Sequence, residues 1–93
     1  MPIGVIFEVP GANAGQYEEV MAELDRRTGE PPGRLCHVAG PSDGAWVVVD
    51  VWESRDAFEA FLTEHLVPVA RHVGFFASLP MSFRVHRLIN TPD

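Results

Sequence analysis

Four stretches of the sequence have the residue pattern of β-strands. Alternation of apolar side chains with other residues predicts strands over 3–9 and 82–89, and runs of strand-forming residues predict strands over 34–39 and 45–53. Residues 40–44, Gly-Pro-Ser-Asp-Gly, have the composition and length of a hairpin turn. We therefore expect the second and third strands to pair antiparallel.

A first helix is predicted between the first two strands, over residues 14–28. Asn13 and Gln16 have the spacing of a capping box, in which each side chain bonds the backbone N–H of the other residue. Gly29, Pro31, Pro32 and Gly33 end the helical pattern. Its apolar face recurs at helical spacing and consists of Tyr17, Val20, Met21 and Leu24.

A second helix should begin after Ser54, a residue type that caps helices. Its apolar face carries Phe58, Phe61, Leu62, His65 and Val69. Pro68 lacks a backbone N–H, so we expect the helix to kink or to end near Leu66. Residues 69–79 are then an irregular or short helical segment, in which Phe75 and Phe76 make a candidate pocket lid.

The element order βαββαβ predicts one α+β domain over residues 1–93, of ferredoxin-like pattern, with a four-stranded antiparallel sheet and helices on one face. The third strand is mostly apolar on both faces, with Trp46, Val48, Asp50 and Trp52 on one of them. The helices can cover only one face, and the chain is too short to supply another layer. A homodimer, in which two subunits form a dimeric α+β barrel, is the simplest way to cover the second face.

Composition narrows the range of partners. Thirteen acidic residues against seven basic ones give a net charge of -6, which disfavours nucleic acid and anionic membrane surfaces. The apolar run 3–9 is too short to span a membrane and lacks the basic start of a signal peptide. The single cysteine, Cys36, and the absence of a zinc-like Cys/His spacing indicate a cytoplasmic protein without a metal site.

The segment 49–61, which contains Trp-Glu-Ser followed by Phe58, resembles the strand-to-helix junction of antibiotic biosynthesis monooxygenase-type proteins. The resemblance implies the dimeric α+β barrel superfamily. That superfamily includes quinone-forming oxygenases that need no metal or flavin, haem-degrading enzymes, polyketide cyclases and proteins without known chemistry. Fold alone does not choose among these activities.

Two branches can be compared residue by residue. The haem-degrading branch implies an Asn in the first strand and a Trp and a His in the second helix, but this sequence has Phe7 or Glu8 and Phe61 at the first two positions, which disfavours haem degradation. Polyketide cyclases of this fold carry a His in a His-Val-Gly-Phe segment, which recurs here from His72 to Phe75. That resemblance makes His72 a candidate catalytic residue.

Two further residues are candidates for general-base chemistry. His65 projects from the second helix among apolar side chains, where an imidazole would be a base in a pocket or a buried structural histidine. Asp50 lies on an apolar strand face, where it would be a base or part of an ion pair. Aromatic and aliphatic side chains would then bind the substrate, namely Phe7, Trp52, Phe58, Phe61 and Leu62.

We therefore expect a cofactor-independent monooxygenase or cyclase acting on an aromatic or polyketide-like small molecule, in a pocket between sheet and helices. In the oxygenase version the deprotonated substrate itself reduces oxygen, so no cofactor is expected. The alternative is a homodimer of the same fold that binds a small molecule or serves assembly without catalysis. His37 and His86 should lie on opposite sheet edges, and the surface or an interface is the expected place for both.

Overall fold

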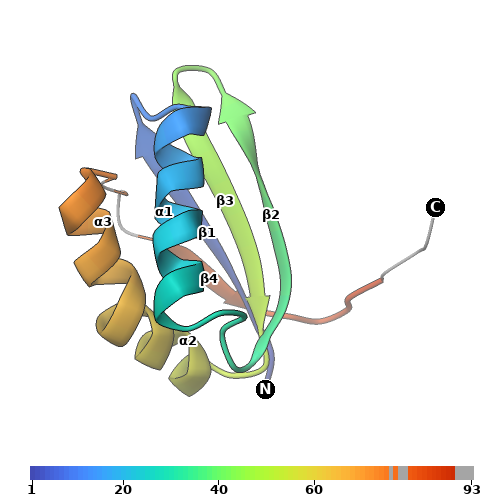
Figure 1. The fold of residues 1–93 in the computed structure, drawn as a ribbon. Helices are drawn as coiled ribbons and strands as arrows, with labels where there is room; N and C mark the ends of the chain where they lie inside the picture. The colour runs from blue at the N-terminus through green and yellow to red at the C-terminus, as the bar shows by residue number, and fades with distance from the viewer. Residues whose placement is uncertain (76, 78–79, 90–93) are drawn as a thin grey trace.

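A computed structural model describes residues 1–75, 77 and 80–89 of the 93-residue chain. Within this part the elements follow the predicted order, with four strands in one antiparallel sheet of order β2-β3-β1-β4 and the helices packed against one face (Figure 1). The elements are β1 (Ile3–Pro10), α1 (Ala14–Arg27), β2 (Arg34–Ser42), β3 (Ala45–Trp52), α2 (Arg55–Phe61), a π-helical turn (Leu62–Leu66), α3 (Val67–Val73) and β4 (Met81–Arg84). The predicted ferredoxin-like α+β fold is confirmed.

Both predicted helix starts are capped as the sequence indicates. Asn13 Oδ1 accepts the Gln16 N–H at 2.9 Å, and Gln16 Oε1 accepts the Asn13 N–H at 3.1 Å, which completes the capping box of α1. Ser54 Oγ accepts the Ala57 N–H at 3.1 Å at the start of α2. These local bonds fix where each helix leaves the preceding segment.

The second helical segment bends around Pro68 rather than ending there. Pro68 has no N–H, so the carbonyl of Glu64, one turn earlier, lacks its α-helical donor. The wider π-helical turn precedes the proline, and the side chain of Arg27 in α1 donates to the Glu64 carbonyl at 3.1 Å. Pro68 lies in the first turn of α3, and the backbone stays helical from the π-helical turn into α3. α3 ends at Gly74, which adopts a left-handed conformation with φ of 86°.

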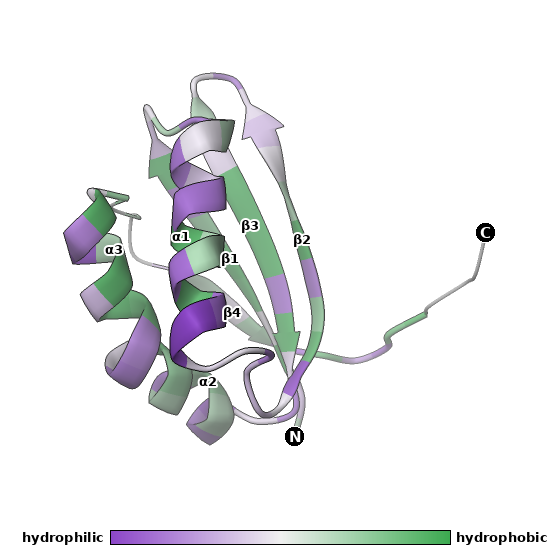
Figure 2. Cartoon of the chain, in the orientation of Figure 1, coloured by the Kyte–Doolittle hydropathy of each residue, from purple (hydrophilic) through white to green (hydrophobic). Residues whose placement is uncertain are grey.

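One face of the sheet and the helices enclose the core. Val5 of β1 pairs with Asp50 of β3, and Phe7 pairs with Val48, so alternate residues of both strands point at the helices. Figure 2 shows β1 and β3 as largely hydrophobic strands behind α1. The buried apolar residues are Ile3, Val5, Phe7, Val9, Val20, Leu24, Trp46, Val48, Trp52, Phe58, Phe61, Val69 and Phe75.

The opposite face of the sheet is also apolar, and no helix of the described chain covers it (Figure 1). Val38 pairs with Val49 on this face, and Met81 pairs with Ile6. Val38 and Met81 are 60% and 61% exposed. After β4 the chain runs away from the domain, and Leu88 and Ile89 are exposed there.

Two predicted strand ends are wrong by three residues or more, and the other strand boundaries agree to within one residue. β2 extends to Ser42 because its pairing with β3 continues to the hairpin turn, where Ser42 pairs with Ala45. β4 ends at Arg84 rather than at Ile89 because Arg84 pairs with Ile3, the first residue of β1, so no strand remains beside later residues. The predicted lid residue Phe76 and the tail 90–93 lie outside the described residues.

The contact between Gly4 and Phe83 gives a test of packing on the open face. The two residues are cross-strand partners, and a Cβ atom on Gly4 would lie 2.3–2.8 Å from three atoms of the Phe83 ring. We expect Gly4→Ala to lower the free energy of unfolding by about 1 kcal/mol, because the half-exposed Phe83 ring must move aside to make room for the new methyl group. In a Phe83→Ala background the same change should cost much less, as a urea-unfolding double-mutant cycle would measure. Equal costs in both backgrounds would contradict this contact.

Candidate functional site

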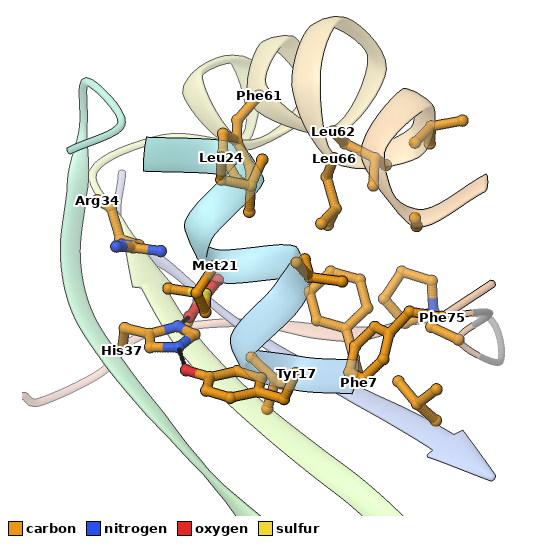
Figure 3. A pocket seen from close by; sticks show the side chains of 18 of the residues that line it. Phe7, Tyr17, Met21, Leu24, Arg34, His37, Phe61, Leu62, Leu66 and Phe75 are labelled. Atoms are coloured by element: carbon orange, nitrogen blue, oxygen red, sulfur yellow. Dashed lines mark hydrogen bonds and ion pairs between the residues drawn. The ribbon is translucent and has the colours of Figure 1, made fainter. Parts of the chain in front are cut away.

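A cavity of about 280 Å³ lies between the helices and the covered face of the sheet (Figure 3). β1, β2 and β3 form its floor, and α1, the π-helical turn and α3 form its walls. Most of the lining is apolar. Four of its polar side chains, those of Tyr17, Arg34, His37 and Asp50, gather at one end (Figure 3), and the fifth, Arg71, belongs to α3. The lining residues are Phe7, Val9, Tyr17, Val20, Met21, Leu24, Arg34, His37, Val48, Asp50, Phe61, Leu62, Leu66, Val67, Ala70, Arg71, Phe75, Ala77 and Pro80.

Three polar side chains at this end form one hydrogen-bonded chain. Tyr17 Oη lies 2.6 Å from His37 Nε2, and His37 Nδ1 lies 2.5 Å from Asp50 Oδ1. Asp50 is only 3% exposed, whereas Tyr17 and His37 are half-buried. This series of hydrogen bonds therefore leads from the cavity wall to a carboxylate in the core, as the dashed lines in Figure 3 indicate.

Strand register and helix packing bring these residues together. His37 of β2 and Asp50 of β3 are direct cross-strand partners on the covered face. Tyr17 lies in the first turns of α1, where its ring stacks nearly parallel to the His37 imidazole, with centroids 6.0 Å apart. The Tyr17 ring also contacts Trp46, with centroids 5.2 Å apart. The phenol is thus held by packing as well as by its hydrogen bond.

The hydrogen-bonding capacity of each group determines which atom donates in each of the two hydrogen bonds. An ionised carboxylate only accepts hydrogen bonds, so Asp50 requires the proton of His37 on Nδ1. Nε2 of the neutral ring is then an acceptor, and Tyr17 donates its O–H to it. The lone pairs of the Tyr17 oxygen remain available to a ligand in the cavity. This arrangement can accept a proton at Tyr17 and pass one on to His37.

Burial changes the acidity of the phenol. Loss of hydration raises the pKa of Tyr17 above its ordinary value of 10.0, and the negative charges of Glu18 and Asp50 raise it further, against the opposing effect of Arg34. Tyr17 is consequently a neutral hydrogen-bond donor near pH 7. A proton transfer from Tyr17 to His37 must be driven by the proton that Tyr17 receives.

Arg34 joins the polar end because of an irregularity in β2. The pairing of β2 with β3 shifts between Arg34 and Cys36, so that Arg34 pairs with Trp52 and His37 with Asp50. Residues 34 and 37 would face opposite sides of a regular strand, but this bulge turns both toward the helices. Figure 3 shows the guanidinium and the imidazole at the same end of the cavity.

The predicted site residues divide between the cavity and its surroundings. Asp50, Phe7, Phe61 and Leu62 line the cavity, whereas the remaining four do not. His65 packs beside Phe61, and its buried Nδ1 has no hydrogen-bond partner within the described chain. His72 is exposed on α3.

The other two predicted binding residues belong to the core. Trp52 is fully buried, and its ring packs against those of Phe58 and Phe61, with centroids 5.8 and 5.1 Å away. Phe58 is also buried, against Phe7 and Trp52. Both side chains support the cavity wall from behind rather than facing a ligand.

Four polar residues of the cavity had not been predicted as site residues, namely Tyr17, Arg34, His37 and Arg71. Tyr17 was identified only as part of the apolar face of α1, although it is the sole member of that face with a hydroxyl group. His37 was expected at the surface or at an interface, yet it pairs with Asp50. Counting back from the turn at 43–44 places residue 37 opposite residue 50, and this signal could have joined them.

At the level of sequence, no protein-family model matches the chain and no curated protein matches it. Solved structures do match over nearly its whole length. SnoaB, a cofactor-independent oxygenase from Streptomyces nogalater, is 19% identical, with a TM-score of 0.65 and 97% of each chain covered. A protein from Caulobacter crescentus described as a candidate antibiotic biosynthesis monooxygenase is 23% identical, with a TM-score of 0.63 over 95% of this chain and 91% of that one.

A haem-degrading protein from Mycobacterium tuberculosis also matches, with 21% identity and a TM-score of 0.61 over 97% of this chain and all of the other. The chain therefore has the fold of antibiotic biosynthesis monooxygenase-type proteins, as its sequence resemblance implied. Proteins of different chemistry share this fold, so the fold alone does not define an activity. No helix in the described ranges has the length and apolar character that crossing a membrane requires.

Titration of Tyr17 can test the described environment directly, because it is the only tyrosine of the chain. We expect the phenolate absorbance of the folded protein to appear at a higher pH than that of the urea-unfolded protein. Since the folded-state pKa is raised, the neutral phenol contributes stability that is fully present below the unfolded pKa. This contribution is lost as the pH rises through the folded-state pKa. Coincident titration curves would contradict the buried, hydrogen-bonded phenol.

Proposed function

We propose that this protein is a cofactor-independent enzyme that removes a proton from an aromatic or polyketide-like small molecule bound in the cavity. The observation that carries the proposal is the Tyr17–His37–Asp50 chain at the polar end of an otherwise apolar cavity. Base catalysis requires a group that accepts a proton beside the substrate and an environment that stabilises the resulting charge. The three residues provide both.

In the proposed reaction, an acidic hydroxyl or activated C–H of the substrate lies against the Tyr17 oxygen. Tyr17 accepts the substrate proton while its own proton moves to His37 Nε2, so one proton enters the chain and one imidazolium forms. Asp50 stabilises that imidazolium through Nδ1 without itself taking a proton. The substrate is left as an electron-rich anion among the apolar walls.

The anion can react in two ways. In the oxygenase version it reduces O₂, one oxygen atom enters the ring as a second carbonyl, and the other leaves as water, which converts a hydroxyaromatic into a quinone. In the cyclase version an enolate carbon of a polyketide-like chain attacks a carbonyl of the same molecule. The first step is common to both. The fold shared with SnoaB, an oxygenase described as cofactor-independent, supports the oxygenase version.

The geometry gives less support to haem degradation. Among the four histidines, His37 alone lines the cavity of the described chain, and both of its ring nitrogens already have partners. His65 and His72 lie on the helical layer but outside the cavity lining. An imidazole available to bind iron would therefore require a rearrangement of the Asp50 pair. We place the base at His37 and Tyr17 instead of at His65.

Anthrone is a suitable test compound because its acidic CH₂ group reports the first step separately from oxidation. Under nitrogen in D₂O the enzyme should accelerate deuterium exchange at this group, and under oxygen it should form anthraquinone and water. We expect Tyr17→Phe and His37→Gln to lower the exchange rate by about 10²–10⁴-fold, the usual size of general acid–base catalysis. His65→Gln should change it little.

Each outcome of the anthrone experiment has a distinct meaning. Exchange together with quinone formation supports the oxygenase version, and exchange without oxidation supports the cyclase version. Binding without exchange would overturn the enzymatic proposal in favour of a binding protein. Loss of exchange in the His65 variant but not in the His37 variant would transfer the role of base to His65.

We further propose that the protein functions as a homodimer that covers the open sheet face. A contiguous apolar face without a covering layer is typical of an interface, and Leu88 and Ile89 extend away from their own domain. Val38 lies on this face opposite Val49, whereas Ala22 lies exposed on α1 on the helical side.

Substitution at Val38 tests this assembly. Val38→Glu would bury two symmetry-related charges in the proposed interface, and we expect sedimentation at micromolar concentration to show a shift from dimer to monomer. Ala22→Glu adds the same charge on the helical side and should leave the dimer intact. A wild-type protein that sediments as a monomer would contradict the dimer without bearing on the cavity.

A further inference from the structure

The β2 bulge turns toward the cavity a cation that a regular strand would have directed at the open face. Residue 34 shares its parity with Cys36 and Val38, which face away from the helices, yet Arg34 pairs with the buried Trp52 and lines the cavity. Bulges often occur beside functional sites, where they redirect one side chain. The polar end of the cavity thus contains both a proton acceptor and a guanidinium group.

Arg34 is held by a carboxylate partner that another carboxylate can replace. Its side chain is only 10% exposed, whereas that of its partner Glu30 is 72% exposed. Glu30 Oε1 accepts from Arg34 Nε at 3.1 Å, and Oε2 accepts from Nη2 at 3.3 Å. One flexible surface carboxylate therefore occupies the guanidinium fork in a two-point contact. Because Glu30 is mostly exposed, its carboxylate regains water when it leaves, and an incoming carboxylate can take its place without leaving the buried guanidinium unpaired.

We infer that the substrate of the proposed enzyme carries a carboxylate, which Arg34 binds in place of Glu30 while the reacting group lies against Tyr17. This inference rests on the proposed function and adds the chemical class of the substrate. The fork of a guanidinium matches the two oxygens of a carboxylate, and such charge-assisted pairs are among the strongest hydrogen bonds in proteins. The bound Glu30 side chain already shows this geometry at Arg34.

The charges of the cavity agree with an anionic ligand. Two arginines, Arg34 and Arg71, line it, and its only carboxylate among the described lining residues is that of Asp50, which is already paired with His37. The whole chain has a net charge of -6, so its overall field repels anions. The Arg34 guanidinium therefore places a buried positive charge beside the cavity of an acidic protein, which favours a negatively charged group there.

The size of the cavity restricts the rest of the substrate. Its volume of about 280 Å³ is near the lower end of the range for small-molecule pockets. A buried apolar cavity of about 150 Å³ holds one benzene ring. Two or three fused rings bearing a hydroxyl and a carboxylate therefore suit the space, with the rings among Phe7, Leu62 and Leu66 and the polar groups at the end near His37 (Figure 3).

Isomeric hydroxynaphthoates and the matching naphthols serve as paired ligands, with dissociation constants measured by calorimetry under nitrogen. For wild type we expect at least one hydroxynaphthoate to bind about tenfold or more tightly than its naphthol. Arg34→Gln should abolish that difference and leave naphthol binding unchanged, and Arg34→Lys should retain part of it. Glu30→Gln should tighten hydroxynaphthoate binding about two- to fivefold, because the competing carboxylate is removed. The exposed Arg26→Gln variant is the matched control and should behave as wild type.

A purely structural ion pair would not produce opposite effects on ligand binding when Arg34 and Glu30 are substituted. If wild type binds both ligands of every pair equally, or if Arg34→Gln weakens both by the same factor, the inference is overturned. A Glu30→Gln variant that weakens hydroxynaphthoate binding would overturn it as well. These binding results are independent of the anthrone exchange, so failure of the proposed chemistry and failure of carboxylate recognition can be told apart.

Discussion

A carboxylate on the apolar face of the sheet is the constraint on which the site depends. Asp50 is 3% exposed, and an unpaired charge at that depth would be strongly unfavourable. His37 is placed opposite it by the β2–β3 register, and Tyr17 of α1 completes the chain. The requirement to pair one buried charge thus couples the hairpin to the first helix. A slip of one residue in register would separate Asp50 from its partner.

The cavity combines two environments that proton-transfer chemistry needs side by side. Apolar walls from β1, the π-helical turn and α3 exclude water from the ligand, which strengthens electrostatic interactions inside. The polar end holds one carboxylate, one imidazole, one phenol and the Arg34 guanidinium. They come from the N-terminal part of α1, the first residues of β2 and the last residues of β3. These three elements are separate in the sequence. The site is therefore a property of the fold rather than of a local motif.

Much of the fold followed from local signals, whereas most of the polar site did not. Caps at Asn13 and Ser54 and the alternation along β1 and β3 predicted the elements because they depend on neighbouring residues. Asp50 was predicted as a site residue from its strand face. Arg34 was not, because the bulge that redirects it leaves no recognisable mark in the sequence. His65 was favoured on α-helical spacing, but it lies within the wider π-helical turn at 62–66, where that spacing does not hold.

The bond from Arg27 to the Glu64 carbonyl has a consequence for sequence divergence. The Arg27 guanidinium donates to a carbonyl that lost its helical donor only because residue 68 is proline. In a relative with another residue at position 68, a backbone N–H could satisfy that carbonyl, and selection for arginine at position 27 would relax. Positions 27 and 68 should therefore covary although their side chains belong to different helices. Such covariation would reflect a backbone carbonyl that lacks its helical N–H donor rather than a contact between two side chains.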